Sequence, residues 1–311
     1  MGLILSLTLN PAIDRNVTVD KLVFEDRAYI LSTVEAAGGR GINASGVVHS
    51  FKGKTLAIAV SGGRNGKRLE EFLLKSGFPV ELVRIKNEIR VNMTIVDRQG
   101  LAVKLNEVGP EVSLSELARV ERAVKARLPG SQWLMICGST PPGVPPDFYA
   151  RLIRLAQMYK VRTLVDTDGE PLQAALDAKP TAVAPNQQEA ERLLGRVLLT
   201  RTHFLEAAER IRAMGAESVV LSLGARGAVG ALPGGSLVEV VPPRVDVLSP
   251  IGSGDALAAA FAWSMSQRND FSDALRWGVA AGTASARLPG VTLANLVQTR
   301  DVYQRVEVRG V

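Results

Sequence analysis

The sequence predicts an α/β protein with a mostly parallel sheet flanked by helices, and a second, smaller β-sheet. Short hydrophobic runs alternate with amphipathic segments along most of the 311 residues, a pattern typical of strands and helices that follow one another in a parallel sheet. Two regions break this alternation and contain strand-like segments alone. The composition, 46% hydrophobic and 22% charged, is that of a globular chain long enough to bury a large core.

Six hydrophobic runs are the candidate strands of the main sheet. They lie at 3–9, 55–60, 133–138, 162–167, 181–185 and 218–223. Four amphipathic segments have the spacing of surface helices, at 113–127, 146–159, 186–195 and 203–214. The chain after Ile251 is predicted to be mainly helical, with a run of small apolar residues at 256–263.

Residues 15–36 and 88–107 are predicted to form strands without helices between them. In the second region the letters DRQG, at 97–100, fit a hairpin turn. Such strands have no place in a doubly wound sheet. We therefore expect them to form a small β-lid, built from two insertions, that covers one edge of the main sheet. The chain, 1–311, is then a single domain with this lid attached.

The composition argues against several classes of protein. The net charge is +6 and the isoelectric point about 9.6. However, Lys and Arg alternate with acids and aromatic residues make up 5%, so we expect phosphorylated small molecules as partners and no nucleic acid. No apolar run is long enough to cross a bilayer and no signal peptide is indicated, which predicts a cytoplasmic protein with no membrane partner. Cys137 is expected in a buried strand, and His49 and His203 lack metal-ligand spacing.

Two glycine-rich stretches were compared with nucleotide-binding motifs. The loop 38–46, GGRGINASG, fits the dinucleotide fingerprint by letter, but the acid needed about 20 residues later to bind the ribose is absent. The stretch 61–68 fails as a P-loop because Arg68 stands where a Ser or Thr must reach magnesium. The first loop also suits a sugar, since Arg40 and Asn43 offer a charge and an amide beside exposed backbone. The alternative is a tight strand-to-helix turn without a ligand.

The stretch 249–263, SPIGSGDALAAAFAW, places one carboxylate between a glycine-rich turn and an apolar helix. The amides of such a turn, with the positive end of the helix dipole behind them, form an anion site. Asp255 then has two interpretations. It is either a helix cap or the proton acceptor that phosphoryl transfer needs beside a phosphate site.

Nine short motifs occur along the chain in a fixed order. They are TLNPAID (8–14), AGGRGIN (37–43), IRVN (89–92), LNEVGP (105–110), GSTPPGVP (138–145), DTDGEPL (166–172), PNQQE (185–189), SLGARGA (222–228) and IGSGD (251–255). In this order they resemble the ribokinase-like carbohydrate kinases of the phosphofructokinase B family, over essentially the whole chain. The resemblance is strongest to the branch with 1-phosphofructokinase, tagatose-6-phosphate kinase and the minor phosphofructokinase. It implies a ribokinase-like (Rossmann-like) fold, and the two-insertion β-lid is similar to that family's lid.

The resemblance implies a binding site for a sugar that already carries a phosphate. Asp14 would accept hydrogen bonds from sugar hydroxyls, and Asn10 would shape the same loop. Arg90 would grip the existing phosphate, a task suited to a bidentate guanidinium, with Arg40 and Arg27 assisting. The other implied sugar contacts are Gly38, Gly39, Asn43 and Ser139.

The resemblance also implies ATP and Mg²⁺ as cofactors. Asn186 and Glu189 match the Asn-x-x-Glu motif that positions magnesium and the nucleotide phosphates through water. The implied contacts along the ATP phosphates and ribose are Ser222, Gly224 and Gly227. Ala184 stands where the family commonly has lysine, which predicts a higher requirement for ATP.

Asp255 takes the role of catalytic base in this resemblance. The amides of Gly252, Ser253 and Gly254 would stabilise the charge on the phosphoryl group during transfer. The small residues at 256–263 would let the following helix pack closely beneath the turn and hold it rigid.

The leading hypothesis is an ATP- and magnesium-dependent kinase of a ketohexose monophosphate. Fructose 1-phosphate, converted to fructose 1,6-bisphosphate, is the first choice; tagatose 6-phosphate and fructose 6-phosphate are the alternatives. A kinase of a neutral sugar or nucleoside would leave Arg40 and Arg90 facing an uncharged ligand. A sugar-phosphate-binding protein that has lost transfer is favoured by Ala184 and disfavoured by the intact Asp255. If the lid covers another subunit, as in relatives, the protein is a homodimer.

Overall fold

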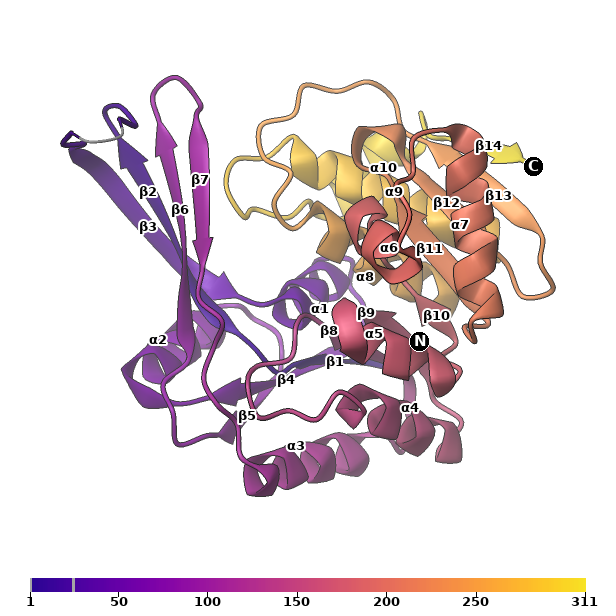
Figure 1. Ribbon diagram of the computed structural model, residues 1–311, viewed down its shortest axis with the longest axis horizontal. Helices are drawn as coiled ribbons and strands as arrows, with labels where there is room; N and C mark the ends of the chain where they lie inside the picture. The colour runs from indigo at the N-terminus through magenta and orange to yellow at the C-terminus, as the bar shows by residue number, and fades with distance from the viewer. Residues whose placement is uncertain (1, 24–25) are drawn as a thin grey trace.

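The computed structural model describes residues 2–23 and 26–311, which form a sheet with helices on both faces and a lid standing to one side (Figure 1). Ten strands from these residues make the main sheet, in the order β14-β13-β12-β11-β10-β9-β8-β1-β4-β5. Strand pairs from β11 to β5 are parallel, whereas β12, β13 and β14 join antiparallel at one edge. The predicted class, α/β with a mostly parallel sheet, is confirmed.

All six predicted strands of the main sheet are present. They are β1 (Leu3–Thr8), β4 (Thr55–Ser61), β8 (Ser131–Cys137), β9 (Arg162–Asp166), β10 (Ala182–Val183) and β11 (Ser218–Ser222). Four further strands were not predicted: β5 (Val80–Arg84), β12 (Ala228–Ala231), β13 (Leu237–Val241) and β14 (Glu307–Gly310). The last of these pairs with β13, so the mainly helical C-terminal part ends by returning to the sheet.

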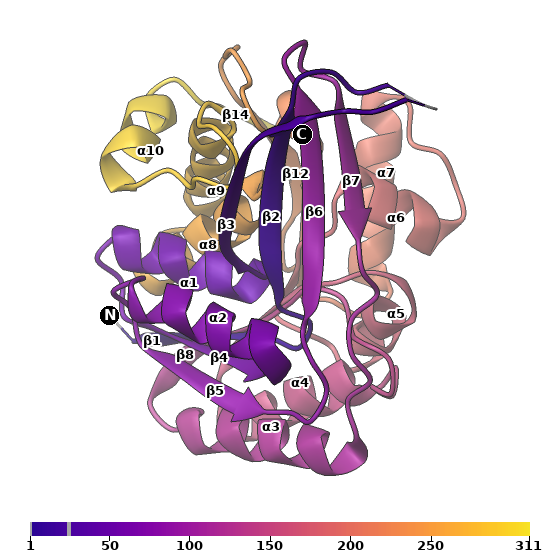
Figure 2. The same cartoon turned by 90° about the vertical axis from the view of Figure 1, so that its left-hand side faces the viewer.

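Helices cover both faces of the sheet (Figures 1 and 2). One face carries α3 (Leu114–Arg127), α4 (Phe148–Met158), α5 (Gly169–Asp177), α6 (Gln187–Leu194) and α7 (Arg201–Ala213). The other carries α1 (Arg40–Ser50), with α2 (Gly63–Leu74) beside it, α8 (Ser253–Ser266), α9 (Phe271–Ala286) and α10 (Leu296–Tyr303). None of the helices in the described ranges has the length and apolar character needed to cross a bilayer.

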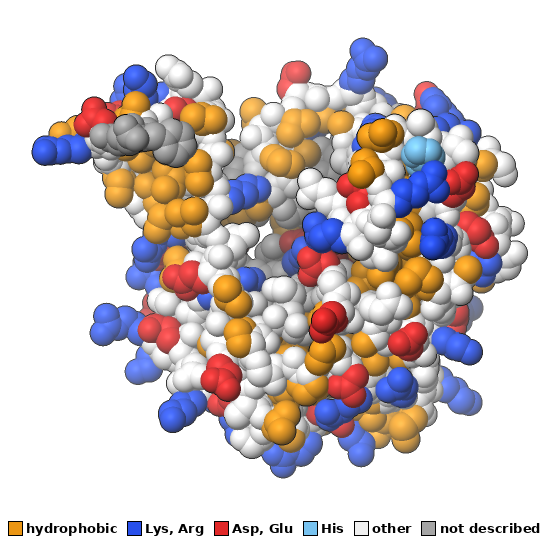
Figure 3. All heavy atoms as spheres, viewed as in Figure 1, with side chains coloured by type: hydrophobic (Ala, Val, Ile, Leu, Met, Phe, Trp, Pro, Cys, Tyr) orange, Lys and Arg blue, Asp and Glu red, His pale blue; other side chains and the backbone are white. Residues whose placement is uncertain are grey.

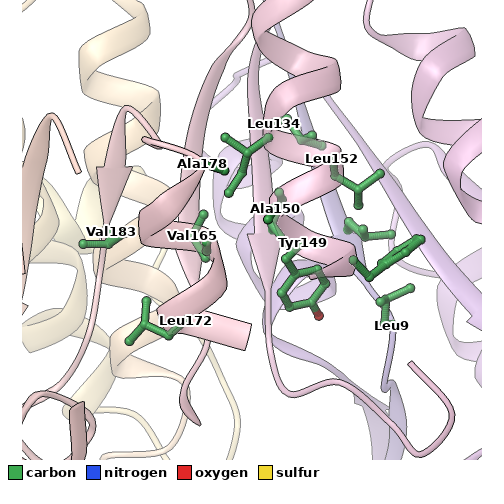
Figure 4. Close-up of a cluster of buried hydrophobic side chains, with 14 of the residues drawn as sticks. Leu9, Leu134, Tyr149, Ala150, Leu152, Val165, Leu172, Ala178 and Val183 are labelled. Atoms are coloured by element: carbon green, nitrogen blue, oxygen red, sulfur yellow. The ribbon is translucent and has the colours of Figure 1, made fainter. Parts of the chain in front are cut away.

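The core on the α4 face is formed by aliphatic side chains from the strands and from the helices above them (Figure 4). Leu134 and Val165 on the sheet and Leu172 on α5 are fully or almost fully buried. The buried hydroxyl of Tyr149 donates a hydrogen bond of 3.1 Å to the carbonyl oxygen of Gly138. This bond ties α4 to the turn that follows β8, where the cavity described below begins.

The opposite face is packed closely because small residues line the contact between α8 and α9. A Cβ atom on Gly278 would lie 2.9 Å from the carbonyl oxygen of Leu257, and one on Gly282 equally close to that of Ser253. Glycine is required at both positions for this approach. The predicted close packing beneath the turn at 252–254 is therefore present, and Cys137 is buried in the same core, as expected.

Aromatic rings fill the outer part of this face. The rings of Trp263 and Trp277 have centroids 5.2 Å apart, Phe51 lies 5.1 Å from Trp263, and Tyr303 stacks on Trp277 at 4.3 Å. Such pairs contribute roughly 0.5–1.5 kcal/mol each beyond their buried area. Together they join α8, α9 and α10 into one rigid layer.

The predicted small β-sheet is confirmed as a separate four-stranded sheet, in the order β3-β2-β6-β7. Its strands are β2 (Ala12–Val19), β3 (Ile30–Gly38), β6 (Arg90–Asp97) and β7 (Ala102–Asn106). The predicted hairpin turn at 97–100 joins β6 to β7, and the amide of Gly100 donates to the carbonyl oxygen of Asp97 at 3.1 Å. Residues 24–25 of the first predicted insertion lie outside the described residues.

An ion-pair cluster around a buried carboxylate connects this lid to the body of the protein. The carboxylate of Glu35 on β3 contacts Arg15 on β2 at 2.7 Å and Arg68 on α2 at 2.5 Å. The Glu35 side chain is 10% exposed. The base of the lid is thus fixed to α2, while its far end extends away from the body (Figure 1).

Candidate active site

A polar cavity of about 510 Å³ lies between the lid, the carboxyl ends of the parallel strands and the start of α8. Its floor is formed where β1, β8, β9, β10 and β11 end, the usual place for a ligand in an open α/β sheet. The volume is within the range of small-molecule sites, roughly 300–1,000 Å³. In Figure 3 the hollow beside the lid contains charged side chains of both signs.

Most of the predicted site residues line this cavity. They are Asn10, Asp14, Gly39, Arg40, Asn43, Arg90, Ser139, Asn186, Glu189, Ser222, Gly252, Gly254 and Asp255. Gly38, Ser253, Gly224 and Gly227 are not part of the lining, and Arg27 is on the exposed segment between β2 and β3. Gly38 instead makes room for a neighbour, because a Cβ there would lie 2.4 Å from the carboxylate of Asp14.

Asp255 lies in the first turn of α8, facing the cavity. The side-chain amide of Asn43 donates a hydrogen bond of 2.7 Å to its Oδ2. Burial and the negative charge of Asp166 raise the pKa of Asp255 to about 7, against the lowering effects of Asn43 and Arg40. A carboxylate with a pKa near neutrality is suited to accept a proton at physiological pH.

The turn before Asp255 offers amides at the start of α8. Gly252 has φ +77°, a conformation that favours glycine, and a Cβ on Gly254 would meet open space. The amide of Ser253 donates to the carbonyl oxygen of Pro250 at 3.3 Å. The amide of Ser253 is thus directed back into its own turn, and the amides of Gly252 and Gly254 remain the candidates for the predicted anion site.

The lid side of the cavity is lined by polar side chains. Asn92 on β6 donates to Asp14 Oδ1 at 3.0 Å. Burial raises the pKa of Asp14, and the Asn92 hydrogen bond and the charge of Arg90 oppose this increase. Asn10 donates to the carbonyl oxygen of Val108 at 2.9 Å and to Ser139 Oγ at 3.3 Å. Asp14 is thus presented to a ligand, and Asn10 shapes the adjoining loop.

Arg90 and Lys104 are the two cations at the lid end of the cavity. The Nη atoms of Arg90 donate to the backbone carbonyls of Glu107, at 2.8 Å, and Asn10, at 3.0 Å, and burial lowers its pKa. Lys104, on β7, has no hydrogen-bond or ion-pair partner within 2–23 and 26–311. Arg90 therefore holds the lid strand against the β1 loop, and Lys104 is the unpaired charge facing the ligand space.

The opposite end of the cavity contains Asn186 and Glu189, which form a capping box at the start of α6. Asn186 Oδ1 accepts from the Glu189 amide and Glu189 Oε2 accepts from the Asn186 amide, both at 2.9 Å. Arg40 contacts Glu189 Oε1 at 3.1 Å and Asp166 Oδ1 at 2.8 Å. The charges of these two acids raise the pKa of Arg40, with Asp166 the larger cause, and burial raises that of Glu189.

These residues fit a hydrated magnesium ion better than a directly ligated one. Carboxylate and amide oxygens are the ligands that magnesium prefers, and it commonly keeps several of its waters. Both oxygens of Glu189 already accept hydrogen bonds, and no group of three or more His, Cys, Asp or Glu side chains within the described ranges has the geometry of a metal site. The prediction therefore remains that Asn186 and Glu189 would bind magnesium through water molecules.

The loop after β11 lies beside the Asn186–Glu189 end of the cavity. The amide of Ser222 donates to the carbonyl oxygen of Pro185 at 3.0 Å, which joins this loop to the 186–189 motif. Gly227 has φ +93°, and a Cβ there would lie 2.0 Å from the carbonyl oxygen of Val240. Gly224 faces open space. Neither glycine lines the cavity.

Comparison with known proteins shows the family of this chain. The model of the pfkB family of carbohydrate kinases matches residues 5–298. The chain belongs to the pfkB family. It is therefore a carbohydrate kinase, a phosphotransferase, and both the resemblance drawn from its motifs and the ribokinase-like fold are confirmed.

Members of the pfkB family match over nearly the full length of this chain. The ATP-dependent 6-phosphofructokinase isozyme 2 of Escherichia coli is 32% identical over 96% of this chain and 97% of its own. The 1-phosphofructokinase of Vibrio cholerae is 26% identical over 98% of this chain and 96% of its own. The crystal structure of Escherichia coli phosphofructokinase-2 in complex with potassium superposes with a TM-score of 0.92, at 31% identity, covering 98% of this chain and 99% of that one.

Five polar residues of the cavity were not predicted: Thr8, Asn92, Lys104, Asn106 and Asp166. Three of them come from the lid strands β6 and β7, in the predicted second insertion. Because alternate residues of a strand share one face, the predicted contact Arg90 indicated that Asn92 also faces the ligand side of the lid. Asp166 was quoted in a motif without a role, although its position at the end of a central strand marks it as a candidate.

Proposed function

We propose that this carbohydrate kinase transfers the γ-phosphoryl group of MgATP to a free primary hydroxyl of a ketohexose monophosphate. The observation that supports this most directly is the arrangement at the start of α8. There a carboxylate with a pKa raised to about 7 lies beside an amide turn, and Asn43 holds it at 2.7 Å. The two cations at the lid end of the cavity provide the charge that a sugar phosphate requires.

In the proposed reaction Asp255 takes the proton of the attacking hydroxyl. The hydroxyl oxygen forms a bond to the γ-phosphorus while the bond to the ADP oxygen breaks, so the proton ends on Asp255 and ADP leaves. The amides of Gly252 and Gly254 stabilise the charge on the group in transit. Asn186, Glu189 and Asp166 would hold magnesium through water, and the ion would neutralise nucleotide phosphate charge.

The candidate substrates differ in where the first phosphate is attached. Fructose 1-phosphate is the first choice from the motifs, as in the Vibrio cholerae relative. Fructose 6-phosphate is the second, because the Escherichia coli 6-phosphofructokinase isozyme 2 is the more similar of the two at 32% identity. Either substrate yields fructose 1,6-bisphosphate. Tagatose 6-phosphate is the third candidate.

The test of the proposed function is ADP release from MgATP with each of these phosphosugars, and with unphosphorylated fructose and ribose. We expect robust turnover with one phosphosugar, and kcat/KM at least about 100-fold lower with either neutral sugar, because the lid cations would then face no anion. Turnover that favours a neutral sugar would refute the substrate class. No ADP release with any of the sugars at high ATP would favour a sugar-phosphate-binding protein that has lost phosphoryl transfer.

Asp255→Asn tests the base directly. We expect kcat to fall at least about 1,000-fold while the dissociation constant of the sugar phosphate changes less than about threefold, because proton transfer is lost and the shape of the site is kept. Single-turnover kinetics and isothermal titration calorimetry measure the two quantities. Asp177→Asn, on an exposed residue of α5, is the control. A variant that retains most of its rate would remove Asp255 from this role.

We further propose that the lid pairs with the lid of a second copy. Exposed apolar side chains gather on and beside its strands, and they include Tyr29, Ile30, Leu31, Val34, Leu101 and Leu105, each about half exposed or more. The lid lobe shows this apolar surface in Figure 3. Exposed apolar side chains gathered on one element in this way mark a candidate interaction surface.

A further inference from the structure

We propose that Arg40 is a resident counter-ion which occupies the acidic end of the cavity and competes with a divalent cation for it. In the protein without nucleotide, its guanidinium neutralises Asp166 and Glu189, so that magnesium binds weakly until nucleotide phosphates are present. This inference rests on the proposed function only in taking magnesium as the natural ion.

The backbone fixes where Arg40 starts. It is the first residue of α1 and follows Gly39, whose φ of +140° is a conformation that L side chains rarely adopt. A Cβ on Gly39 would also lie 2.7 Å from Thr8 Cγ2. The Arg40 stem then passes the turn after β8, where a Cβ on Gly138 would be 4.0 Å from its Cγ. The side chain thus reaches from the sugar-side loop across to the ends of β9 and β10.

The guanidinium ends between two acids that have little contact with water. The side chains of Asp166 and Glu189 are 9% and 2% exposed, whereas that of Arg40 is 36% exposed. Nη1 contacts one acid and Nη2 the other, at 2.8 and 3.1 Å. Acids this buried need a cation. Position 184, which also faces the cavity, is alanine and supplies none.

The other cations of the cavity, Arg90 and Lys104, lie at its lid end, away from these two acids. Arg90 donates to two backbone carbonyls at the lid end, and Lys104 lies on the lid strand β7. Arg40 is therefore the cation that balances the acidic end. A metal ion that approaches the same two carboxylates meets a fixed positive charge a few ångströms away, and like charges at that distance repel strongly in a partly buried site.

Manganese binding to the nucleotide-free enzyme tests this inference, with the loss of the electron paramagnetic resonance signal of free Mn²⁺ as the readout. We expect Arg40→Met to bind one Mn²⁺ at least about tenfold more tightly than the native protein, because the two carboxylates lose their internal cation. We expect Arg40→Lys to gain less, because an ammonium keeps the charge but cannot bridge both acids. Adding Glu189→Gln to Arg40→Met should reverse the gain.

The matched control is Arg192→Met. Arg192 also pairs with an acid, Asp168 at 3.1 Å, and lies on α6 three residues after Glu189, but both partners are largely exposed and outside the cavity. Its Mn²⁺ affinity should equal that of the native protein.

Equal Mn²⁺ affinity in the native protein and in Arg40→Met overturns the proposal. If Arg40→Met does not fold, as judged by circular dichroism, Arg40→Lys is compared with the native protein instead. A Mn²⁺ affinity of Arg40→Lys no higher than that of the native protein then also overturns the proposal. Because neither sugar nor ATP is present, a negative result here is distinct from a failure of the proposed kinase reaction.

Discussion

Asp255 shares its cavity with three other carboxylates, those of Asp14, Asp166 and Glu189. Burial and the negative charge of Asp166 raise its pKa, whereas the Asn43 amide and the Arg40 guanidinium lower it, and the result is about 7. With this pKa, the Asp255 carboxyl group is partly protonated and partly ionised near neutral pH. A base in this state accepts a proton readily and still returns it to water after the reaction.

This pKa predicts the pH dependence of the reaction. The base works when ionised, so kcat/KM should be constant above about pH 7 and fall about tenfold per unit below it. Replacing Asn43 by Leu removes a hydrogen bond that lowers the pKa, and should move the descending limb to higher pH. The kcat/KM for the phosphosugar, measured from about pH 5.5 to about pH 8.5, checks both statements. A native profile that stays flat down to pH 5.5 would falsify the assignment.

The sequence identified Asp255 because its turn and helix are contiguous, so local rules apply to all of the residues involved. It named Glu189 as a site residue but did not predict that Arg40 lies between Glu189 and Asp166. Asp166 and Glu189 are 126 and 149 residues away along the chain, and only the order of the strands in the sheet brings them to one place. The sequence predicted that Arg40 assists in phosphate binding, because it could not show that two acids already balance the charge of Arg40.

At the scale of the element, the lid is a sheet with two different faces. Strand register places Asp14, Asn92 and Asn106 in one row across β2, β6 and β7, and Thr94 and Lys104 in the next row on the same face. Members of both rows line the cavity. Side chains alternate along a strand, so the intervening residues, such as Leu105, point away from the ligand.

Lys104→Met tests what this face recognises. We expect KM for the phosphosugar to rise about tenfold or more with little change in kcat, because the unpaired ammonium is lost while Asp255 and its turn are intact. Activity toward unphosphorylated fructose should not change. Lys21→Met, on an exposed lid residue outside the cavity, is the control. An unchanged KM would show that Lys104 does not contact the phosphate.

The elements that the sequence predicted were those with a clear hydrophobic pattern. The strands of the main sheet are nearly continuous apolar runs, and in the lid strands apolar and polar residues alternate. The strands β12 and β14 have four residues each, and β12 reads Ala-Val-Gly-Ala. Segments this short and this poor in branched residues have little intrinsic preference for a strand, and their pairing at the antiparallel edge of the sheet determines their structure.

At the scale of the whole molecule, the apolar lid surface predicts a dimer. Ile30 and Val34 are 66% and 63% exposed on β3, and a charge there would oppose burial against a second lid. Sedimentation should show a dimer for the native protein and a monomer for the double variant Ile30→Asp with Val34→Asp. The control is Leu74→Asp, which changes a still more exposed leucine, at 81%, on α2; this variant should remain dimeric. A native protein that sediments as a monomer at about micromolar concentration would contradict the proposal.

The three tryptophans of the chain, Trp133, Trp263 and Trp277, all belong to the core shared with α8 and α9, and the lid strands contain none. Their emission therefore reports on one layer of the molecule. During unfolding it follows the loss of the helix that bears Asp255, while the opening or pairing of the lid leaves it unchanged. A tryptophan placed on the lid would give the second signal, and the two halves of the site could then be followed separately in one sample.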